Sequence, residues 1–171
     1  MAAYIQDRRF TDYVHSQLAV PLIYNSLGWR TATMDAVELE RMDMDEGVDY
    51  LLWDDEGRTF GVQERFRGAE YAKYSDATLR FRRDGNRHGD RVRSEFYKIR
   101  AKYLVYGITN GFKHREKRET LTDFIKWVVL DLDFLRGKIR EGAVVIDRSR
   151  KWKKCRVEDR KLHCPEMFNP D

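Results

Sequence analysis

Two neighbouring stretches of this sequence carry a carboxylate, an amide and a guanidinium that could share one site. Asp49 belongs to V-D-Y-L-L-W (48–53), and Gln63 and Arg65 belong to T-F-G-V-Q-E-R-F-R (59–67). Both stretches read as β-strands, and the Asp-Asp-Glu-Gly sequence between them is typical of a hairpin turn. The two strands are therefore expected to pair, with their polar residues close together.

Side chains alternate between the two faces of a strand, and this alternation sorts the residues of the second stretch. Its aromatic and aliphatic residues share one face, which must meet the core, whereas Gln63 and Arg65 lie on the opposite face. On the first stretch Val48, Tyr50 and Leu52 share one face, and Asp49 points to the opposite face. Pairing in a hairpin would therefore bring Asp49 near Gln63 and Arg65. Glu64 falls on the apolar face of a regular strand, and only a bulge would turn it.

This combination of side chains suits the hydrolysis of phosphodiester bonds. A hard cation such as Mg²⁺, or Mn²⁺ in its place, binds oxygen ligands and keeps several waters. We expect Asp49, Gln63 and Glu64 to be the metal ligands, with Glu64 contributing its carbonyl or a carboxylate turned by a bulge. A bound metal lowers the pKa of its water, and Arg65 would hold the phosphate. The predicted catalytic residues are Asp49, Gln63 and Arg65.

The same residues resemble the core of the PD-(D/E)XK, or restriction-endonuclease-like, nucleases. In that family an Asp begins one strand of a hairpin, and an acid-x-Lys triplet lies on the next strand; here the corresponding residues are Asp49 and Gln63-Glu64-Arg65. The resemblance covers about residues 11–109 in topology and a handful of residues in motif. It implies an α-β-β-β-α-β core and a metal-dependent endonuclease that cleaves DNA.

The sequence departs from the family pattern at two positions. Gln63 stands where the family has an acid, and Arg65 stands where it has Lys. Because the pKa of arginine lies above ~12, Arg65 cannot take over proton transfer from a lysine. Water activation would then depend on the metal or on another acid. Glu38 and Glu40 are further candidate ligands if their segment folds over the hairpin.

Hydrophobic periodicity predicts an α/β domain with a mixed central sheet flanked by helices. A helix interrupted at Pro21 and ended by Gly28 is expected over 11–28, and the most apolar strand, 102–109, is expected to be central. Apolar residues at helical spacing predict a long helix over 121–139. The other expected elements are a helix or acidic loop at 34–44, a strand at 77–82, a helix at 91–99, a charged loop at 114–120 and a strand at 143–147.

The 171 residues suit one domain. We expect a core over 1–147 and a basic tail over 148–171 packed on it. No window approaches the ~18 apolar residues that span a bilayer, and no secretory signal begins the sequence, so no membrane partner is expected. With only Cys155 and Cys164, a disulfide scaffold is excluded, and a reducing, cytoplasmic location is favoured.

Charge is distributed unevenly along the chain. Residues 35–56 hold ten acidic and one basic side chain, and residues 65–118 hold sixteen basic and six acidic ones. The basic part is expected to bind DNA, duplex or single-stranded, through its phosphates. Cutting both strands of a duplex needs two sites, which favours a homodimer. The predicted nucleic-acid-binding residues are Arg67, Arg80, Arg82, Arg87, Arg91 and Lys98.

Two other functions fit the same sequence. In the first, the protein keeps the fold and binds nucleic acid without catalysis, with Asp49 capping a strand and Gln63 and Arg65 as ordinary surface residues. In the second, the acidic segment 35–56 blocks another protein, and DNA does not bind at all. Cleavage of DNA with Mg²⁺ or Mn²⁺ separates the nuclease from the first alternative, and DNA binding at low salt separates it from the second.

Overall fold

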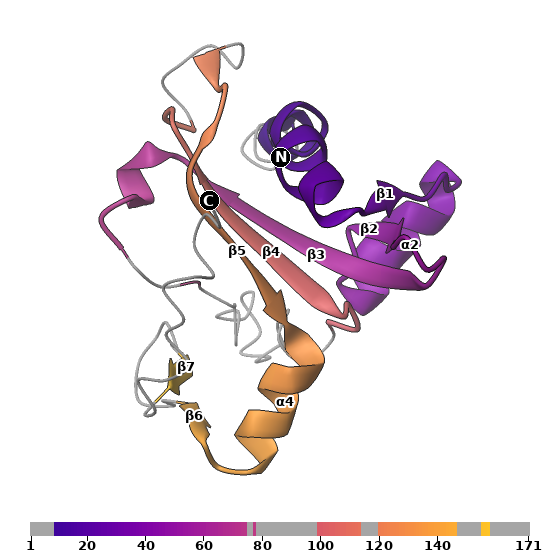
Figure 1. Ribbon diagram of the computed structural model, residues 1–171, viewed down its shortest axis with the longest axis vertical. Helices are drawn as coiled ribbons and strands as arrows, with labels where there is room; N and C mark the ends of the chain where they lie inside the picture. Colours follow the sequence, from indigo (N-terminus) through magenta and orange to yellow (C-terminus); the bar gives the residue numbers. More distant parts are fainter. Residues whose placement is uncertain (1–8, 75–76, 78–98, 114–119, 147–154, 158–171) are drawn as a thin grey trace, which may run out of the picture.

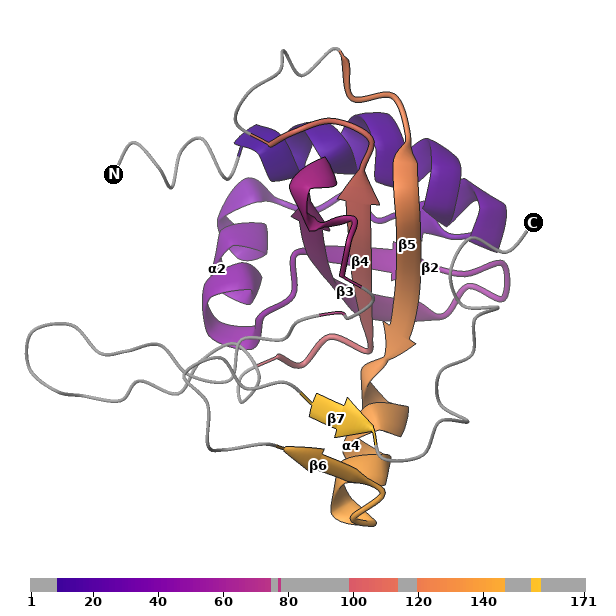
Figure 2. The same ribbon diagram turned by 90° about the vertical axis from the view of Figure 1, so that its left-hand side faces the viewer.

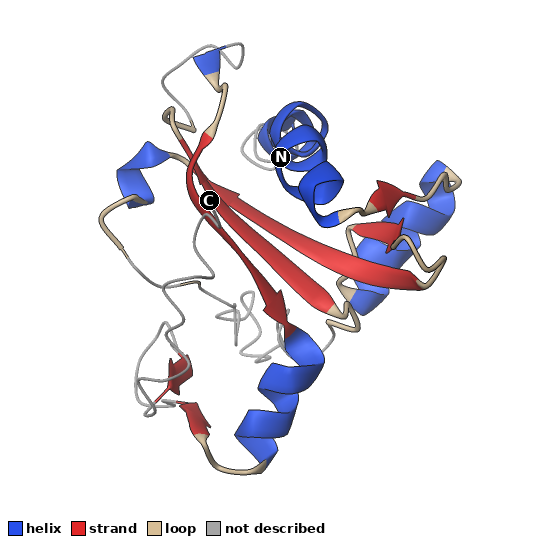
Figure 3. Cartoon of the chain, in the orientation of Figure 1, coloured by secondary structure: helices blue, strands red, loops and turns tan. Residues whose placement is uncertain are grey.

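The computed structural model describes residues 9–74, 77, 99–113, 120–146 and 155–157. This part of the chain forms an α/β fold around a five-stranded mixed sheet with the order β1-β2-β3-β4-β5. Helical segments lie on both sides of the sheet (Figure 1, Figure 3), as the sequence predicted. The strands are β1 (Arg30–Thr31), β2 (Tyr50–Trp53), β3 (Thr59–Arg67), β4 (Tyr103–Thr109) and β5 (Phe124–Asp131).

The predicted hairpin is formed by β2 and β3, which pair antiparallel with Tyr50 opposite Val62. Asp54 holds the turn, because its Oδ1 accepts the backbone N–H of Arg58 at 2.9 Å. Gly57 lies in the turn with φ +76°, a conformation that glycine adopts without steric cost. β3 has the predicted bounds, and the regular part of β2 begins two residues later than predicted.

The predicted N-terminal helix is also present, and it is described from residue 9. It is α-helical over 9–14, continues as the π-helix η1 (His15–Tyr24) and ends in the 3₁₀ turn η2 (Asn25–Leu27). Pro21, which has no N–H to donate, lies inside the π-helical part. Gly28, with φ +71°, ends the helix as predicted.

The acidic segment that could have been a helix or a loop is the helix α2 (Ala36–Glu46). Asp35 caps its beginning, because Oδ1 accepts the N–H of Val37 at 2.8 Å. Gly47 ends it in the left-handed conformation, with φ +60°. Met42 is buried and packs this acidic helix against the sheet.

β4 lies between two partners, as expected for the most apolar strand. It runs parallel to β3, with Gln63 opposite Leu104, and antiparallel to β5, with Val105 opposite Val129. Because β3 also pairs antiparallel with β2, the sheet combines parallel and antiparallel neighbours and is mixed.

The prediction of one long helix over 121–139 was wrong. The chain forms the strand β5 first, and α4 (Leu132–Arg140) follows. Trp127 and Val129 pack toward η1, whereas Val128 packs on the other side of the sheet. A strand covered on both faces carries a continuous apolar run, and such a run is not distinguished from a buried helix by its periodicity.

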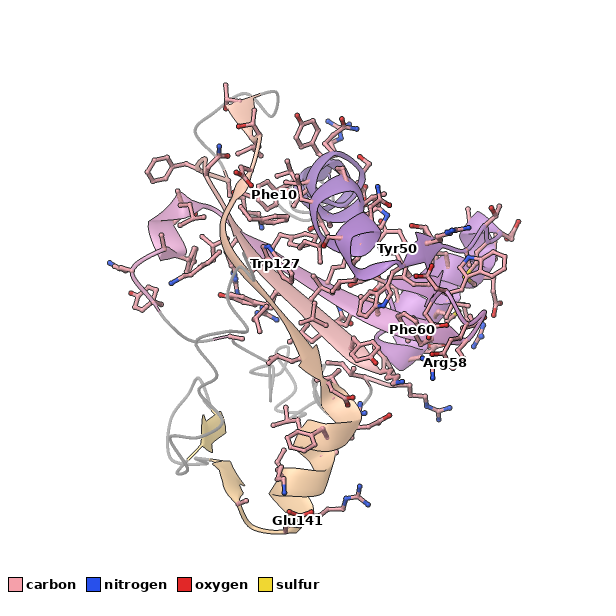
Figure 4. All side chains as sticks on the ribbon, viewed as in Figure 1. Phe10, Tyr50, Arg58, Phe60, Trp127 and Glu141 are labelled. Atoms are coloured by element: carbon pink, nitrogen blue, oxygen red, sulfur yellow. The ribbon has the colours of Figure 1, made fainter. Side chains whose placement is uncertain are left out.

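Two hydrophobic layers hold the sheet between its helices. Between η1 and the sheet lie Phe10, Tyr50, Phe60 and Trp127 (Figure 4), together with the fully buried Tyr24. On the opposite face, α2 and α4 pack over β4 through a second cluster. Its buried members are Met42, Val48, Ile99, Ala101, Leu104 and Leu132.

A separate two-stranded sheet is formed by β6 (Val144–Ile146) and β7 (Cys155–Val157), which run antiparallel. The predicted strand at 143–147 is thus present, and its partner comes from the segment predicted as a basic tail. The expected strand over 77–82 and the expected helix over 91–99 lie outside the described residues except for Ala77 and Ile99, which belong to no regular element. Residues 114–119 of the expected charged loop also lie outside the described residues. No helix within the described part of the chain combines the length and apolar character needed to cross a bilayer.

Candidate active site

Asp49 and Gln63 meet on one face of the β2–β3 hairpin, as predicted. Gln63 Nε2 donates to Asp49 Oδ2 at 2.6 Å. Both residues are largely buried, with 8% of Asp49 and 7% of Gln63 exposed. The contact follows from register, because Tyr50 stands opposite Val62 and the preceding residue therefore stands opposite Gln63.

The Asp49 carboxylate also continues the hydrogen bonding between the two hairpin strands past the first residue of β2. Asp49 N–H donates to Val62 O at 2.9 Å, a backbone bond just before the first residue of β2. The next N–H on this edge of β3 is that of Glu64, and it donates to Asp49 Oδ2 at 2.6 Å. One carboxylate oxygen thus accepts two donors from β3, which fixes the Asp49 side chain against the strand.

The Glu64 side chain lies on the opposite face of β3, as alternation predicts, and no bulge turns it toward Asp49. Its Oε1 is 2.7 Å from His15 Nδ1 and accepts the hydroxyl of Tyr24. Both partners belong to η1, so this carboxylate joins the helix to the sheet. The Glu64 carboxylate therefore does not join Asp49 and Gln63 as a third metal ligand, and its carbonyl lies 3.4 Å from Gln63 Nε2.

His15, Tyr24 and Tyr50 were not singled out as site residues by the sequence. The His15 ring stacks on Tyr50, with centroids 3.6 Å apart and planes 7° apart. Burial raises the pKa of Tyr24 well above its ordinary value, and the negative charge of Glu64 raises it further. The available signal was Glu64 itself, because a carboxylate on a core-facing position needs buried donors.

Arg65 and Arg67 follow Gln63 along the same face of β3. Arg65 is opposite Tyr106 and Arg67 is opposite Ile108 on the parallel strand β4. Both arginine residues are partly buried. The structure thus places Arg65 on the Asp49–Gln63 face, two residues beyond the amide, as predicted.

The residues expected to supply further ligands or DNA contacts are placed as follows. Glu38 forms an exposed pair with Arg41, with Oε1 and Nη2 2.7 Å apart, and its pKa is lowered mainly by this hydrogen bond. Glu40 is exposed on α2. Arg67 is described, whereas the remaining predicted DNA contacts lie outside the described residues: Arg80, Arg82, Arg87, Arg91 and Lys98.

One observation fits the cation that the sequence implied. The amide oxygen of Gln63, Oε1, is buried and has no hydrogen-bond partner among the described residues, although the same amide contacts the Asp49 carboxylate. An unpaired oxygen beside a carboxylate matches the oxygen ligands that Mg²⁺ and Mn²⁺ prefer. In the described ranges there is no group of three or more His, Cys, Asp and Glu side chains arranged to hold a metal ion.

Comparison of the chain with protein-family models, with curated protein sequences and with solved structures finds no match.

Proposed function

We propose that this protein is a metal-dependent nuclease that hydrolyses phosphodiester bonds in DNA, with a core like that of the restriction-endonuclease-like nucleases. The observation that supports the proposal most is the contact between Asp49 and Gln63, whose amide oxygen is buried and without a hydrogen-bond partner among the described residues. The contact joins an anionic and a neutral oxygen donor on one polar face of a hairpin.

The proposed roles follow from the chemistry of each group. Asp49 and Gln63 Oε1 would hold Mg²⁺ or Mn²⁺, with water and phosphate oxygens completing the coordination. The cation, when bound, supplies charge neutralisation of the phosphate and a water of lowered pKa. Arg65 would orient the scissile phosphate, because guanidinium pairs with phosphate oxygens in a bidentate manner.

Two features of the fold support the comparison with that nuclease core. A helix precedes an antiparallel hairpin, and the second hairpin strand is followed by a parallel strand, β4. The acid at the start of the first hairpin strand and the polar residues of the second face the same way. In the proposed comparison, Asp49, Gln63 and Arg65 would correspond to the two acids and the lysine of the family motif.

A catalytically inactive nucleic-acid-binding protein is the second candidate, and a specific observation favours it. Asp49 Oδ2 already accepts two donors, Gln63 Nε2 and Glu64 N–H, each at 2.6 Å. A carboxylate so engaged stabilises the end of a hairpin without any metal. In this candidate the basic residues bind phosphates and the Asp49–Gln63 pair is structural.

The experiment that separates the two is cleavage of supercoiled plasmid and of single-stranded DNA, with Mg²⁺, with Mn²⁺ and with EDTA. The nuclease proposal expects metal-dependent cleavage by the wild-type protein and a loss of at least about a hundredfold in Asp49→Ala. Asp45→Ala, which removes an exposed carboxylate from α2, is the matched control and should cleave normally. Binding of DNA without cleavage under every metal condition would support the second candidate and exclude the first.

A further inference from the structure

Two exposed tyrosines lie just beyond the end of β3, the strand that carries Gln63. Tyr71 belongs to the 3₁₀ turn η3 (Ala69–Tyr71), and Tyr74 follows it. Their side chains are exposed by 37% and 46%, and their ring centroids are 6.3 Å apart. Figure 2 shows η3 on the side of the sheet opposite the N-terminal helix.

Each of these rings has a cation beside it. The Arg67 guanidinium lies over Tyr71, with Cζ 5.0 Å from the ring centroid, and Lys73 Nζ lies 5.2 Å from the centroid of Tyr74. Lys126, on β5, brings a third positive charge close to the tyrosines, because its Nζ donates to Ala72 O at 2.8 Å. We call Arg67, Tyr71, Lys73, Tyr74 and Lys126 the tyrosine platform.

The platform is held in place by the backbone around it. Gly68 begins the turn, and a Cβ there would come within 2.6 Å of Lys113 N, so only glycine fits this close approach. Ala69 N–H donates to Gly111 O at 2.9 Å, and Tyr74 N–H donates to Tyr71 O at 3.0 Å. Together with the Lys126 bond, these contacts hold the backbone that carries the two tyrosines before any ligand binds, which lowers the entropic cost of binding.

We propose that the tyrosine platform stacks the bases of single-stranded nucleic acid and so guides a single strand toward the Asp49–Gln63 site. Exposed aromatic rings interleaved with cations are the features that bind single strands, because every base has a flat face and every linkage has a phosphate. In duplex DNA the bases are already stacked on one another and do not reach such rings. The platform therefore prefers single strands to duplexes.

The geometry of β3 connects the platform with the proposed active site. Gln63, Arg65 and Arg67 alternate onto one face, and four residues of strand span about 13 Å. Arg65 stands between the two ends and can bind a phosphate on the way. The delivery of the bound nucleic acid to the Asp49–Gln63 site rests on the proposed function. Binding of single-stranded nucleic acid to the tyrosine platform needs no metal and no catalysis.

The test measures binding of a fluorescein-labelled oligo(dT) of about twelve nucleotides, and of a duplex of the same length, by fluorescence anisotropy in EDTA and low salt. We expect Tyr71→Ala/Tyr74→Ala to weaken oligo(dT) binding by at least about tenfold and to leave duplex binding unchanged. Tyr71→Phe/Tyr74→Phe keeps the rings and should bind like wild type. Phe134→Ala, which removes an exposed ring from α4, is the control for loss of aromatic surface elsewhere.

A second measurement uses the cations. Lys73→Gln should lower the slope of log affinity against log salt for oligo(dT) by about 0.7, because the variant neutralises one phosphate fewer on a single strand. Equal oligo(dT) affinity of the wild-type and double-alanine proteins, or no binding of oligo(dT) at all, would overturn the platform. Because EDTA removes the divalent metal, failure of the nuclease proposal would leave these binding results intact, and failure of the platform would leave cleavage to be judged separately.

Discussion

Asp49 accepts the main-chain N–H of Glu64 at 2.6 Å, while the side chain of Glu64 lies on the opposite face of the sheet. One residue of β3 therefore fixes the Asp49 carboxylate with its backbone and fixes the helix η1 with its carboxylate. The proposed active site and the buried His15–Glu64–Tyr24 cluster are coupled through this strand, although their side chains do not share a face.

Glu64→Gln should destabilise the fold without removing the bond that positions Asp49. The amide cannot serve as a charged acceptor for both His15 and Tyr24, and unsatisfied buried groups cost about 1–3 kcal/mol. The free energy of unfolding from urea titration should fall by that amount, whereas Glu70→Gln, on an exposed side chain, should change it by less than about 0.5 kcal/mol. Equal stability of the two variants would show that the cluster does not hold η1 to the sheet.

The contribution of Tyr24 to the free energy of unfolding should be lost at alkaline pH. Burial and the neighbouring Glu64 raise the pKa of Tyr24 in the folded protein above the ordinary value of 10.0, so the unfolded chain loses this proton first as pH rises. The contribution is complete below about pH 10 and declines above it. Wild-type protein should exceed Tyr24→Phe in unfolding free energy at about pH 8, and this gap should narrow between about pH 10 and 11.5. A gap that stays constant or widens over that interval would contradict the assignment.

Gly47→Ala should disturb both the fold and the candidate site. Gly47 has φ +60°, and a Cβ there would lie 3.1 Å from Ile99 Cα and 3.3 Å from Gln63 Oε1. The left-handed conformation alone costs a non-glycine residue about 1–2 kcal/mol. Gly57→Ala is the matched control, because its φ is +76° and no atom would lie within 4 Å of the new Cβ. Thermal unfolding should show a larger loss for Gly47→Ala than for Gly57→Ala, and equal losses would mean that the crowding around Gln63 is readily relieved.

Asp131→Ala should weaken α4 where β5 ends. Asp131 Oδ1 accepts the N–H groups of Asp133 at 2.9 Å and Phe134 at 2.8 Å, and loss of such a cap costs about 0.5–2 kcal/mol. Asp133→Ala, which removes an exposed pair with Arg136, should cost less. If both variants unfold at the same urea concentration, the chain does not depend on Asp131 to begin this helix.

The features that the sequence predicted well are local. The alternation of 59–67 and the Asp-Asp-Glu-Gly turn are short-range patterns, and they placed Gln63 and Arg65 on the correct face and Asp49 beside Gln63. Gly28 likewise ended the N-terminal helix at the predicted position. Each of these features depends on backbone geometry within a few residues.

The features that were missed depend on distant partners. The strand β5 was mistaken for part of a helix because both of its faces are covered by apolar residues. Only its pairing with β4 and the hydrophobic layers on its two faces show that the apolar run is a strand and not a helix. His15 lies 49 residues from Glu64 in the chain, so their pairing leaves no local pattern. The partner of β6 was missed for the same reason, since β7 lies in the segment interpreted as a tail.

The most direct test of the proposed site is calorimetric titration of Mn²⁺ into the wild-type protein, Asp49→Ala and the control Asp45→Ala. If Asp49 and Gln63 hold a divalent cation, the wild-type and control proteins will show a binding isotherm that is absent in Asp49→Ala. Superimposable curves for all three proteins would contradict a metal site at this hairpin and, with it, the nuclease.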